Sequence, residues 1–408
     1  MKLLFFSLIL FCSCNILFAQ FEDFNLDKPA AVGMSKDTLD VMDAHFHSMV
    51  DNGQLAGIQT AIFRKGKLIH FNSYGHASKE EEILLDEQSI FRIFSMTKPI
   101  VSVALMQFLE KGTIKLEDPI SKYLPSFKSM KAFSENENIA DAHEIKIVDL
   151  LRHTSGIGYG RGPVDSLNQL YRQANVMGGA NAQEFLASLS SLPLTFQPGS
   201  DWEYGFSTNV IGHLVEELSG QSLLDYLTEN IFKPLGMKDT HFSLPAEKVQ
   251  HFTTGYRVDS DGELAIAEVR DQNRYLNDPS FYNGGGGLVS TTLDYLKFCR
   301  MLLNNGAYKS HQILKKETIE LMTKNHLAVI QKHNPAMNLP RGATGFGLGF
   351  SIYEDDQYFN YGWGGAVGTY FRISPEEELI GILMVQISPY QPLNLRQVFQ
   401  NYMHHAIE

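Results

Sequence analysis

A serine and a lysine stand three residues apart in the stretch FRIFSMTKPI, which covers residues 91–100. Apolar residues surround Ser95 and Lys98, and no other lysine in the chain has a serine three positions before it. A serine hydroxyl is a poor nucleophile until a base removes its proton, and lysine can be that base only when it is neutral. Apolar surroundings lower the pKa of a lysine. The pair is therefore a candidate nucleophile and base, although an isolated S-x-x-K spacing also arises by chance at a helix start.

Pro99 indicates where this stretch becomes helical, because proline is tolerated in the first turn of a helix. We expect a helix to begin close to Ser95 and to continue to Gly112. Ser95 and Lys98 then share one helix face, with their Cβ atoms roughly 5–6 Å apart. The amides of a helix N-terminus also point at any anion that forms there. Acyl transfer further requires a proton relay and a second donor to the oxyanion.

Five more segments carry recognisable patterns. They are DLLRHTSGI (149–157), PGSDWEYGFSTNVIGHLVEELSG (198–220), PLGMKDTHF (234–242), GGGGLVSTTLDY (284–295) and GWGGAVGTYF (362–371). Together with FRIFSMTKPI, and in this order, they resemble the serine β-lactamase and penicillin-binding-protein superfamily over nearly the whole mature chain. The resemblance is to its class C-like branch of β-lactamases, D-alanyl-D-alanine carboxypeptidases and family VIII carboxylesterases.

The resemblance implies both a fold and a set of roles. The fold is α/β (α+β), β-lactamase/transpeptidase-like, with a mostly antiparallel sheet flanked by helices and a helical lobe. Ser95 would be the nucleophile, Lys98 its partner, and Tyr204 a proton relay with phenolate character favoured by Lys98. The amide of Ala366, just after Trp363-Gly364-Gly365, would be the second oxyanion donor. The family needs no cofactor and no metal, so none is expected here.

Two departures from the family pattern bear on the substrate. No K-T-G sequence occurs, and Trp363 stands where penicillin-directed relatives have a lysine or histidine, as it does in the esterase branch. The usual Y-x-N is replaced by Tyr204-Gly205-Phe206, and Asn209 lies too far along to be assumed equivalent. These departures favour an ester substrate over a β-lactam or a D-amino-acid peptide. A substitute cation from a loop or strand is the main alternative, with candidates Lys324, Lys332, Arg341 and Arg372.

Several of these residues also have structural interpretations. Tyr204 and Trp363 could simply be packing aromatics. Gly284 to Gly287 lacks the following Gly-Lys-Ser/Thr of a phosphate loop, so we interpret it as a flexible turn. His153 is interpreted as a turn residue. A catalytically silent homologue that binds cell-wall peptides is the alternative from another class of protein, and the intact Ser95, Lys98 and Tyr204 argue against it.

The N-terminus predicts export. Lys2, an apolar run to Phe11 and the small residue Ala19 form the pattern of a secretory signal peptide at residues 1–19, with a periplasmic or secreted mature protein. Lipidation at Cys14 is a minority alternative. The net charge of −12 and the lack of a basic run argue against nucleic acid as a partner, so we expect a small ester or amide instead. The sequence does not fix the oligomeric state.

Hydrophobic periodicity predicts one domain over residues 20–408, with a helical insertion at about 116–244. Strands at both ends of the chain indicate one mostly antiparallel sheet that the two ends close. We expect loops at 126–143 and 156–179. The predicted helices are 36–50, 147–151, 182–192, 208–219, 222–232, 292–304 and 393–406, and the predicted strands are 57–63, 67–75, 347–353, 357–361, 368–373 and 379–386.

Overall fold

The computed structural model describes residues 24–133, 139–162, 165–334, 337–355 and 358–408. Its helices are α1 Lys36–Asp51, α2 Thr97–Glu110, α3 Ile147–Leu151, α4 Asp165–Ala174, α5 Ala182–Ser190, α6 Ser207–Ser219, α7 Leu223–Leu227, α8 Lys233–Leu235, α9 Thr292–Leu303, α10 Lys316–Thr323, α11 Ala328–His333 and α12 Leu395–His405. The signal sequence predicted at 1–19 lies outside the described residues. The single domain predicted for 20–408 stays a prediction.

An eight-stranded sheet joins the two ends of the chain in the order β12-β13-β14-β15-β16-β1-β2-β3. Its pairs are antiparallel, and β1 lies directly beside β16, as the sequence predicted. Its strands are β1 Gly57–Arg64, β2 Lys67–Ser78, β3 Ile83–Leu84, β12 Gly345–Phe346, β13 Ser351–Glu354, β14 Phe359–Gly364, β15 Tyr370–Ser374 and β16 Leu379–Met384. The smaller sheets contain β4 Phe91–Arg92, β5 Lys131–Phe133, β6 Ile139–Asp141, β7 Gly255–Val258, β8 Leu264–Glu268, β9 Val289–Ser290, β10 Ala307–Tyr308, β11 His311–Gln312 and β17 Ile387–Ser388.

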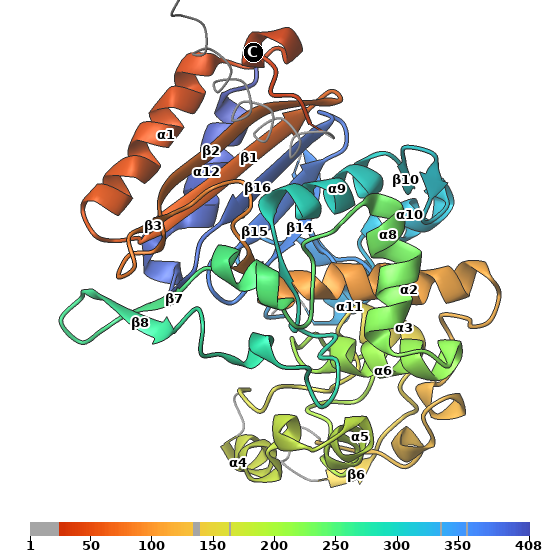
Figure 1. Cartoon of the computed structure of the whole chain (residues 1–408). Coiled ribbons are helices and arrows are strands. Elements are labelled where there is room, and N and C mark those ends of the chain that lie inside the picture. The colour runs from red at the N-terminus through yellow and green to blue at the C-terminus, as the bar shows by residue number, and fades with distance from the viewer. Residues whose placement is uncertain (1–23, 134–138, 163–164, 335–336, 356–357) are drawn as a thin grey trace, which may run out of the picture.

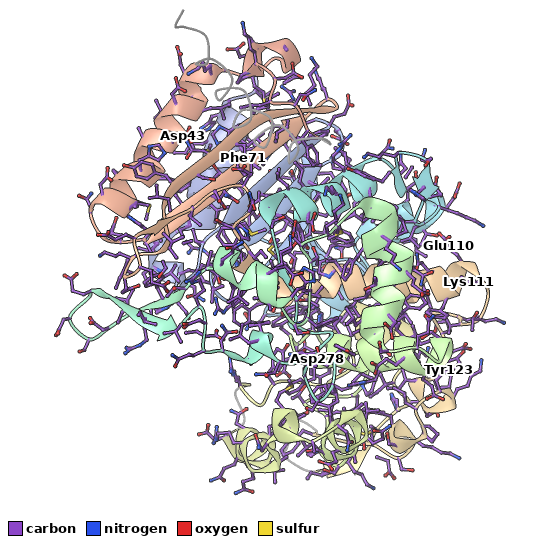
Figure 2. All side chains as sticks on the ribbon, viewed as in Figure 1. Asp43, Phe71, Glu110, Lys111, Tyr123 and Asp278 are labelled. Carbon is purple, nitrogen blue, oxygen red and sulfur yellow. The ribbon has the colours of Figure 1, made fainter. Side chains whose placement is uncertain are left out.

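Both faces of the central strands are buried, because helices cover each side (Figure 1). Successive side chains of a strand point to opposite faces. Ile58 and Ile62 of β1 therefore pack in one apolar cluster with α1 and α12, whereas Ala61 and Phe63 pack in the other with α2 and α9. In Figure 2, Asp43 and Phe71 lie in the sheet half, and Tyr123 lies in the helical half.

The strand β4 leads directly into the predicted nucleophile and is tied to the end of the sheet. Gln386 donates from its side-chain amide to the carbonyl of Arg92 at 3.1 Å, and its carbonyl oxygen accepts from the Arg92 amide at 3.2 Å. The polar head of Arg92 is buried and pairs with Glu268 at 2.8 Å. These contacts fix the segment that precedes Ser95 against a residue from the far end of the chain.

Two loop predictions are wrong in part. The segment 126–143 contains the short strands β5 and β6, and the segment 156–179 contains helix α4. The hairpin of β7 and β8 was also not predicted, nor were α10 and α11. The buried side chains of α4 are Leu167, Asn168 and Tyr171. Its apolar residues do recur at helical spacing, at Leu167, Leu170, Tyr171 and Ala174, so the signal for this helix was present in the sequence and was missed.

Candidate active site

Ser95 lies in a single 3₁₀ turn, Phe94–Met96, that runs directly into α2. Its side chain is half-buried, and it lines two cavities. The residue before it, Phe94, has a φ of +43°, which is unusual for a bulky side chain. Gly286 lies close beneath this turn, because a Cβ atom there would be 3.5 Å from the Phe94 carbonyl carbon. The backbone that presents Ser95 is therefore held in an unfavourable conformation, as is frequent at functional sites.

Lys98 is fully buried one turn further on, with a relative exposure of 1%. Its amine donates to the carbonyl oxygen of Gly285 at 2.5 Å and to the hydroxyl of Tyr159 at 3.1 Å. The amine also lies 4.6 Å from the centre of the Tyr204 ring. Burial lowers the pKa of Lys98 to about 7. Near neutral pH a large fraction of Lys98 is therefore uncharged and able to accept a proton.

Tyr204 lies beside Ser95, just before helix α6. Burial raises the pKa of Tyr204 to about 12, although the nearby Ser95, Trp363 and Tyr159 oppose that shift. Its hydroxyl is buried and has no hydrogen-bond partner of good geometry among the described residues. The neutral phenol is thus the favoured form, in contrast to the phenolate expected from the sequence, because burial outweighs the stabilising neighbours. A neutral phenol can still relay a proton by giving one up as it receives another.

The turn that follows α3 positions Tyr204. Gly205 packs so closely against this turn that a Cβ atom would lie 1.9 Å from the carbonyl oxygen of Ile157. The ring of His153 lies 5.1 Å from the Tyr204 ring, and His153 has a φ of +59°. Burial and, secondly, the charge of Lys98 hold the pKa of His153 well below its usual value, so the imidazole is neutral. The predicted turn role of His153 therefore includes packing against Tyr204.

The end of β14 brings the segment GWGGAVGTYF (362–371) to the predicted nucleophile. A Cβ atom on Gly365 would lie 2.5 Å from the carbonyl oxygen of Ile93, so only glycine allows this approach. Ala366 lines both cavities together with Ser95. The buried Trp363 ring lies 5.2 Å from the Tyr204 ring, and its Nε1 atom has no hydrogen-bond partner of good geometry among the described residues. Trp363 is thus both packed and adjacent to the site.

Arg396 holds the turn that carries Ala366. Its guanidinium donates to the carbonyl oxygens of Gly365 at 2.5 Å and Thr369 at 2.9 Å. A Cβ atom on Gly364 would lie 2.4 Å from the centre of this guanidinium, so the glycine makes room for it. Arg396 was not predicted, since a lone arginine at the start of a terminal helix carries no sequence signal of this contact.

The run of four glycines at 284–287, called the polyglycine segment here, also has a role that the sequence did not predict. Gly285 accepts the hydrogen bond of Lys98, and its own amide donates to Asn283 Oδ1 at 2.9 Å. The Asn209 side chain donates to the same oxygen at 2.7 Å. Asn209 therefore reaches the site after all, in the wall of the second cavity, although its distance from Tyr204 along the chain argued against this. Asn209 lies in the first turn of α6, and this turn keeps it close to the site although it is five residues after Tyr204.

Tyr159 is a further residue that sequence reasoning missed. It is the hydrogen-bond partner of Lys98, and burial raises its pKa well above the usual value. Its ring packs edge-on against the Tyr204 ring, with centres 5.4 Å apart. A tyrosine shortly after the H-T-S-G turn was the available signal, but nothing in the spacing linked it to Lys98.

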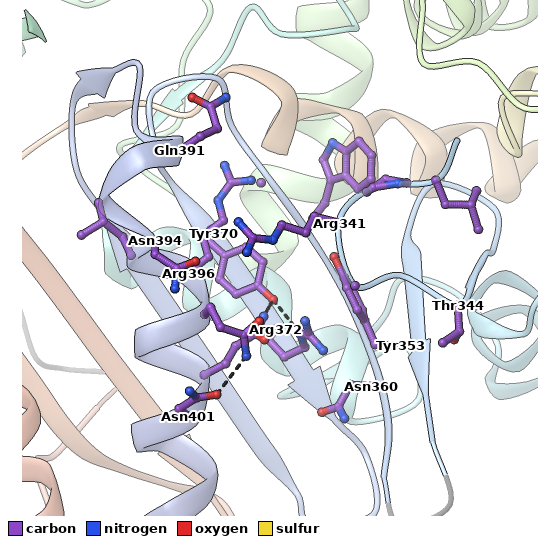
Figure 3. Close-up of a pocket in the computed structure, with 18 of the residues that line it drawn as sticks. Arg341, Thr344, Tyr353, Asn360, Tyr370, Arg372, Gln391, Asn394, Arg396 and Asn401 are labelled. Atoms are coloured by element: carbon purple, nitrogen blue, oxygen red, sulfur yellow. Dashed lines mark hydrogen bonds between the residues drawn. The ribbon is translucent and has the colours of Figure 1, made fainter. Parts of the chain in front are cut away.

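Two cavities meet at Ser95. The first has a volume of about 870 Å³ and lies between α12 and strands β13 to β15, as the close-up in Figure 3 shows. The second, of about 1160 Å³, is bounded by the polyglycine segment and the chain around Tyr159. Besides Ser95, both are lined by Trp202, Tyr204, Asn338 and Ala366. A substrate therefore has room on both sides of the nucleophile.

The described residues contain no group of three or more His, Cys, Asp and Glu side chains that could hold a metal ion. No helix within the described ranges is long and apolar enough to cross a membrane. Of the cations that the sequence offered as substitutes, Arg341 and Arg372 line the first cavity. Lys324 and Lys332 line neither of the two cavities.

The chain belongs to the β-lactamase family, whose model matches residues 42–399. It is 30% identical to Protein Rv1367c of Mycobacterium tuberculosis, over 86% of this chain and 90% of that protein. It is 28% identical to Esterase EstB of Burkholderia gladioli, over 65% of this chain and 70% of the esterase. The solved structure of simvastatin synthase LovD from Aspergillus terreus has the same fold, with a TM-score of 0.77 at 24% identity, over 91% of this chain and 98% of LovD. The protein is a serine hydrolase of this family.

Proposed function

We propose that the protein hydrolyses carboxylic esters through an acyl intermediate on Ser95. The observation that carries this proposal is the environment of Lys98, which is buried, has a pKa lowered to about 7, and lies one helical turn from a half-buried serine. A lysine in this state can remove the serine proton near neutral pH.

Acylation begins when neutral Lys98 takes the proton from Ser95 Oγ, which attacks the ester carbonyl. The negative charge on the carbonyl oxygen is then stabilised by the amides of Ser95 and Ala366. When the tetrahedral intermediate collapses, the carbon–oxygen bond to the alcohol breaks. Tyr204 gives its proton to the leaving alkoxide and regains one from Lys98. A water molecule then attacks the acyl-serine by the same steps in reverse, which releases the acid and restores Ser95.

Trp363 supports esters over substrates with a carboxylate at the scissile bond. Tryptophan has one N–H donor and an apolar face, so it leaves such a carboxylate poorly paired. The related EstB, which is named an esterase, is consistent with this preference. A neutral group next to the scissile bond would instead pack against the indole.

Intact mass spectrometry after incubation with a fluorophosphonate tests the proposal, followed by a panel of p-nitrophenyl esters. We expect one adduct on the wild-type protein and none on Ser95→Ala, which should also hydrolyse no ester above background. Ser102→Ala is the matched control, because Ser102 is a buried serine of the same helix that lines neither cavity. A single adduct that persists in Ser95→Ala would assign the nucleophile elsewhere.

A further inference from the structure

We propose that the first cavity binds an anionic group of the ester substrate, a carboxylate or a phosphate, and that Arg372 is its anchor. The inference rests on the proposed ester hydrolysis and specifies its substrate class. The anionic group would lie several bonds from the scissile carbonyl. It would not occupy the position beside that carbonyl, where Trp363 stands.

Arg372 is a buried cation that faces this cavity. Its relative exposure is 5%, and it lines the cavity wall. Its Nε atom donates to the Tyr370 hydroxyl at 2.6 Å, and its guanidinium lies 3.5 Å from the centre of the Tyr353 ring. No carboxylate of the described residues lies within 4.0 Å of it. A buried charge without an opposite charge is costly, and a bound anion would remove that cost.

The stacking on Tyr353 and the bond to Tyr370 leave the terminal nitrogens of Arg372 as the donors available to a ligand. Arginine presents these donors as a planar fork that fits a carboxylate or a phosphate with two hydrogen bonds. The ring beneath keeps the fork in one orientation. Arg372 is therefore prearranged to bind an oxyanion.

Two further cations make the inner cavity positive. Figure 3 shows Arg341 and Arg396 converging on the same space as Arg372. Arg396 uses one terminal nitrogen to hold the turn that carries Ala366, and its buried Nε atom has no hydrogen-bond partner among the described residues. Arg341 is exposed at the rim. The acidic residues of this cavity are Glu354 and Asp355, and both are exposed at its outer part.

The strand register sets the distance to the nucleophile. Arg372 pairs with Gly362 of β14, and Ala366 follows four residues later. At about 3.3 Å per residue these backbone positions are at most roughly 13 Å apart, because β14 ends at Gly364 and Ala366 lies in the following turn. The anchor and the oxyanion donor thus belong to different positions along the strand, and an anion on Arg372 would be joined to the scissile ester by a chain of several atoms.

The test uses matched esters that differ only in charge. These are the mono-p-nitrophenyl esters of adipate and suberate, the same esters with the free carboxylate methylated, and a p-nitrophenyl ester with a terminal phosphate. We expect kcat/KM to be at least about tenfold higher for an anionic ester than for its methylated partner, because a charge-assisted contact has about that strength. Whichever of the carboxylate and phosphate esters is preferred identifies the anion.

Variants connect the preference to Arg372. We expect Arg372→Gln to reduce the ratio of anionic to methylated kcat/KM by about tenfold, chiefly through KM for the anionic ester, and Arg372→Lys to retain part of it. Arg300→Gln is the control, since Arg300 also lies over aromatic rings but lines neither cavity, and it should leave the ratio unchanged. If Arg372→Gln does not fold, the wild-type ratio and Arg372→Lys decide.

Calorimetry with Ser95→Ala separates this inference from the proposed function. Adipate should bind to this variant, and dimethyl adipate should bind at least about tenfold more weakly. Ester hydrolysis with equal rates for charged and methylated partners, and no adipate binding, would overturn the inference and leave the function standing. Adipate binding without turnover of any ester would support the inference and refute the proposed function.

Discussion

The amine of Lys98 lies 4.6 Å from the ring centre of Tyr204 and donates to the carbonyl oxygen of Gly285. The carbonyl holds the amine in place against the Tyr204 ring, and Tyr159, which accepts a hydrogen bond from Lys98 at 3.1 Å, packs against the same ring. Lys98 and Tyr204 should therefore act as one unit rather than as two independent groups.

That coupling predicts losses of activity that do not multiply. Residues on one proton path are strongly non-additive. We expect Lys98→Ala, Tyr204→Phe and the double variant each to lower kcat by a similar factor, on the order of 10³ or more by analogy with catalytic triads. Lys111→Ala, at the end of the same helix, is the control. If the loss in the double variant equals the product of the single losses, the two residues act independently.

The rate should depend on the protonation of Lys98. Because burial lowers its pKa to about 7, we expect kcat/KM for a neutral ester to rise with pH through about 7 and then to level. Tyr204, with a pKa raised to about 12, should add no inflection below pH 10. A pH–rate profile from about pH 3.5 to 10 measures this. An inflection only near pH 4 to 5 would instead point to a carboxylate as the base.

The same lysine should reduce stability. Between pH 7 and about 10.5 the unfolded chain holds the Lys98 proton more often than the folded protein does, so the free energy of unfolding attributable to Lys98 rises with pH across that window. We therefore expect Lys98→Met to be more stable than wild type at pH 7 and its advantage to shrink toward pH 10. Urea denaturation at both pH values tests this. An unchanged or lower midpoint at pH 7 would contradict it.

Trp363 predicts discrimination against carboxylates at the scissile bond. An unpaired contact of roughly 1.5–3 kcal/mol corresponds to a 10- to 150-fold loss of specificity. We expect short-chain p-nitrophenyl esters to be hydrolysed with far higher kcat/KM than nitrocefin or a D-Ala-D-Ala peptide. Comparable turnover of either of the last two would refute the ester preference and leave the serine mechanism intact.

The N-terminal pattern predicts export with cleavage near Ala19. N-terminal sequencing of the mature protein should begin close to Gln20. A diacylglyceryl group on Cys14 would indicate a lipoprotein instead, and an unprocessed Met1 in the cytoplasm would refute export.

Local signals predicted the elements that depend on short stretches of sequence. The proline in FRIFSMTKPI predicted the start of α2 to within a few residues. The helix predicted at 292–304 matches α9, Thr292–Leu303, closely. Ser95 and Lys98 were predicted as a pair because they lie three residues apart at the start of a helix. Their spacing alone determines that they are neighbours.

Contacts between distant segments could not be predicted in the same way. Tyr159 and Gly285 reach Lys98, and Arg396 reaches the turn that carries Ala366, only through tertiary packing. A tyrosine, a glycine or an arginine has many structural uses, so the residue type alone predicts none of these contacts. The same limit applies to substrate charge. The sequence offered four candidate cations, and only the fold determines that Arg341 and Arg372 face the cavity.

The bond between Gln386 and the backbone of Arg92 joins positions 294 residues apart. Chain closure over such a span is slow and cannot occur before the later residue exists. The strand that leads to Ser95 can therefore be tied to the end of the sheet only after almost the entire polypeptide has been synthesised, so the site is among the last parts of the fold that can be completed.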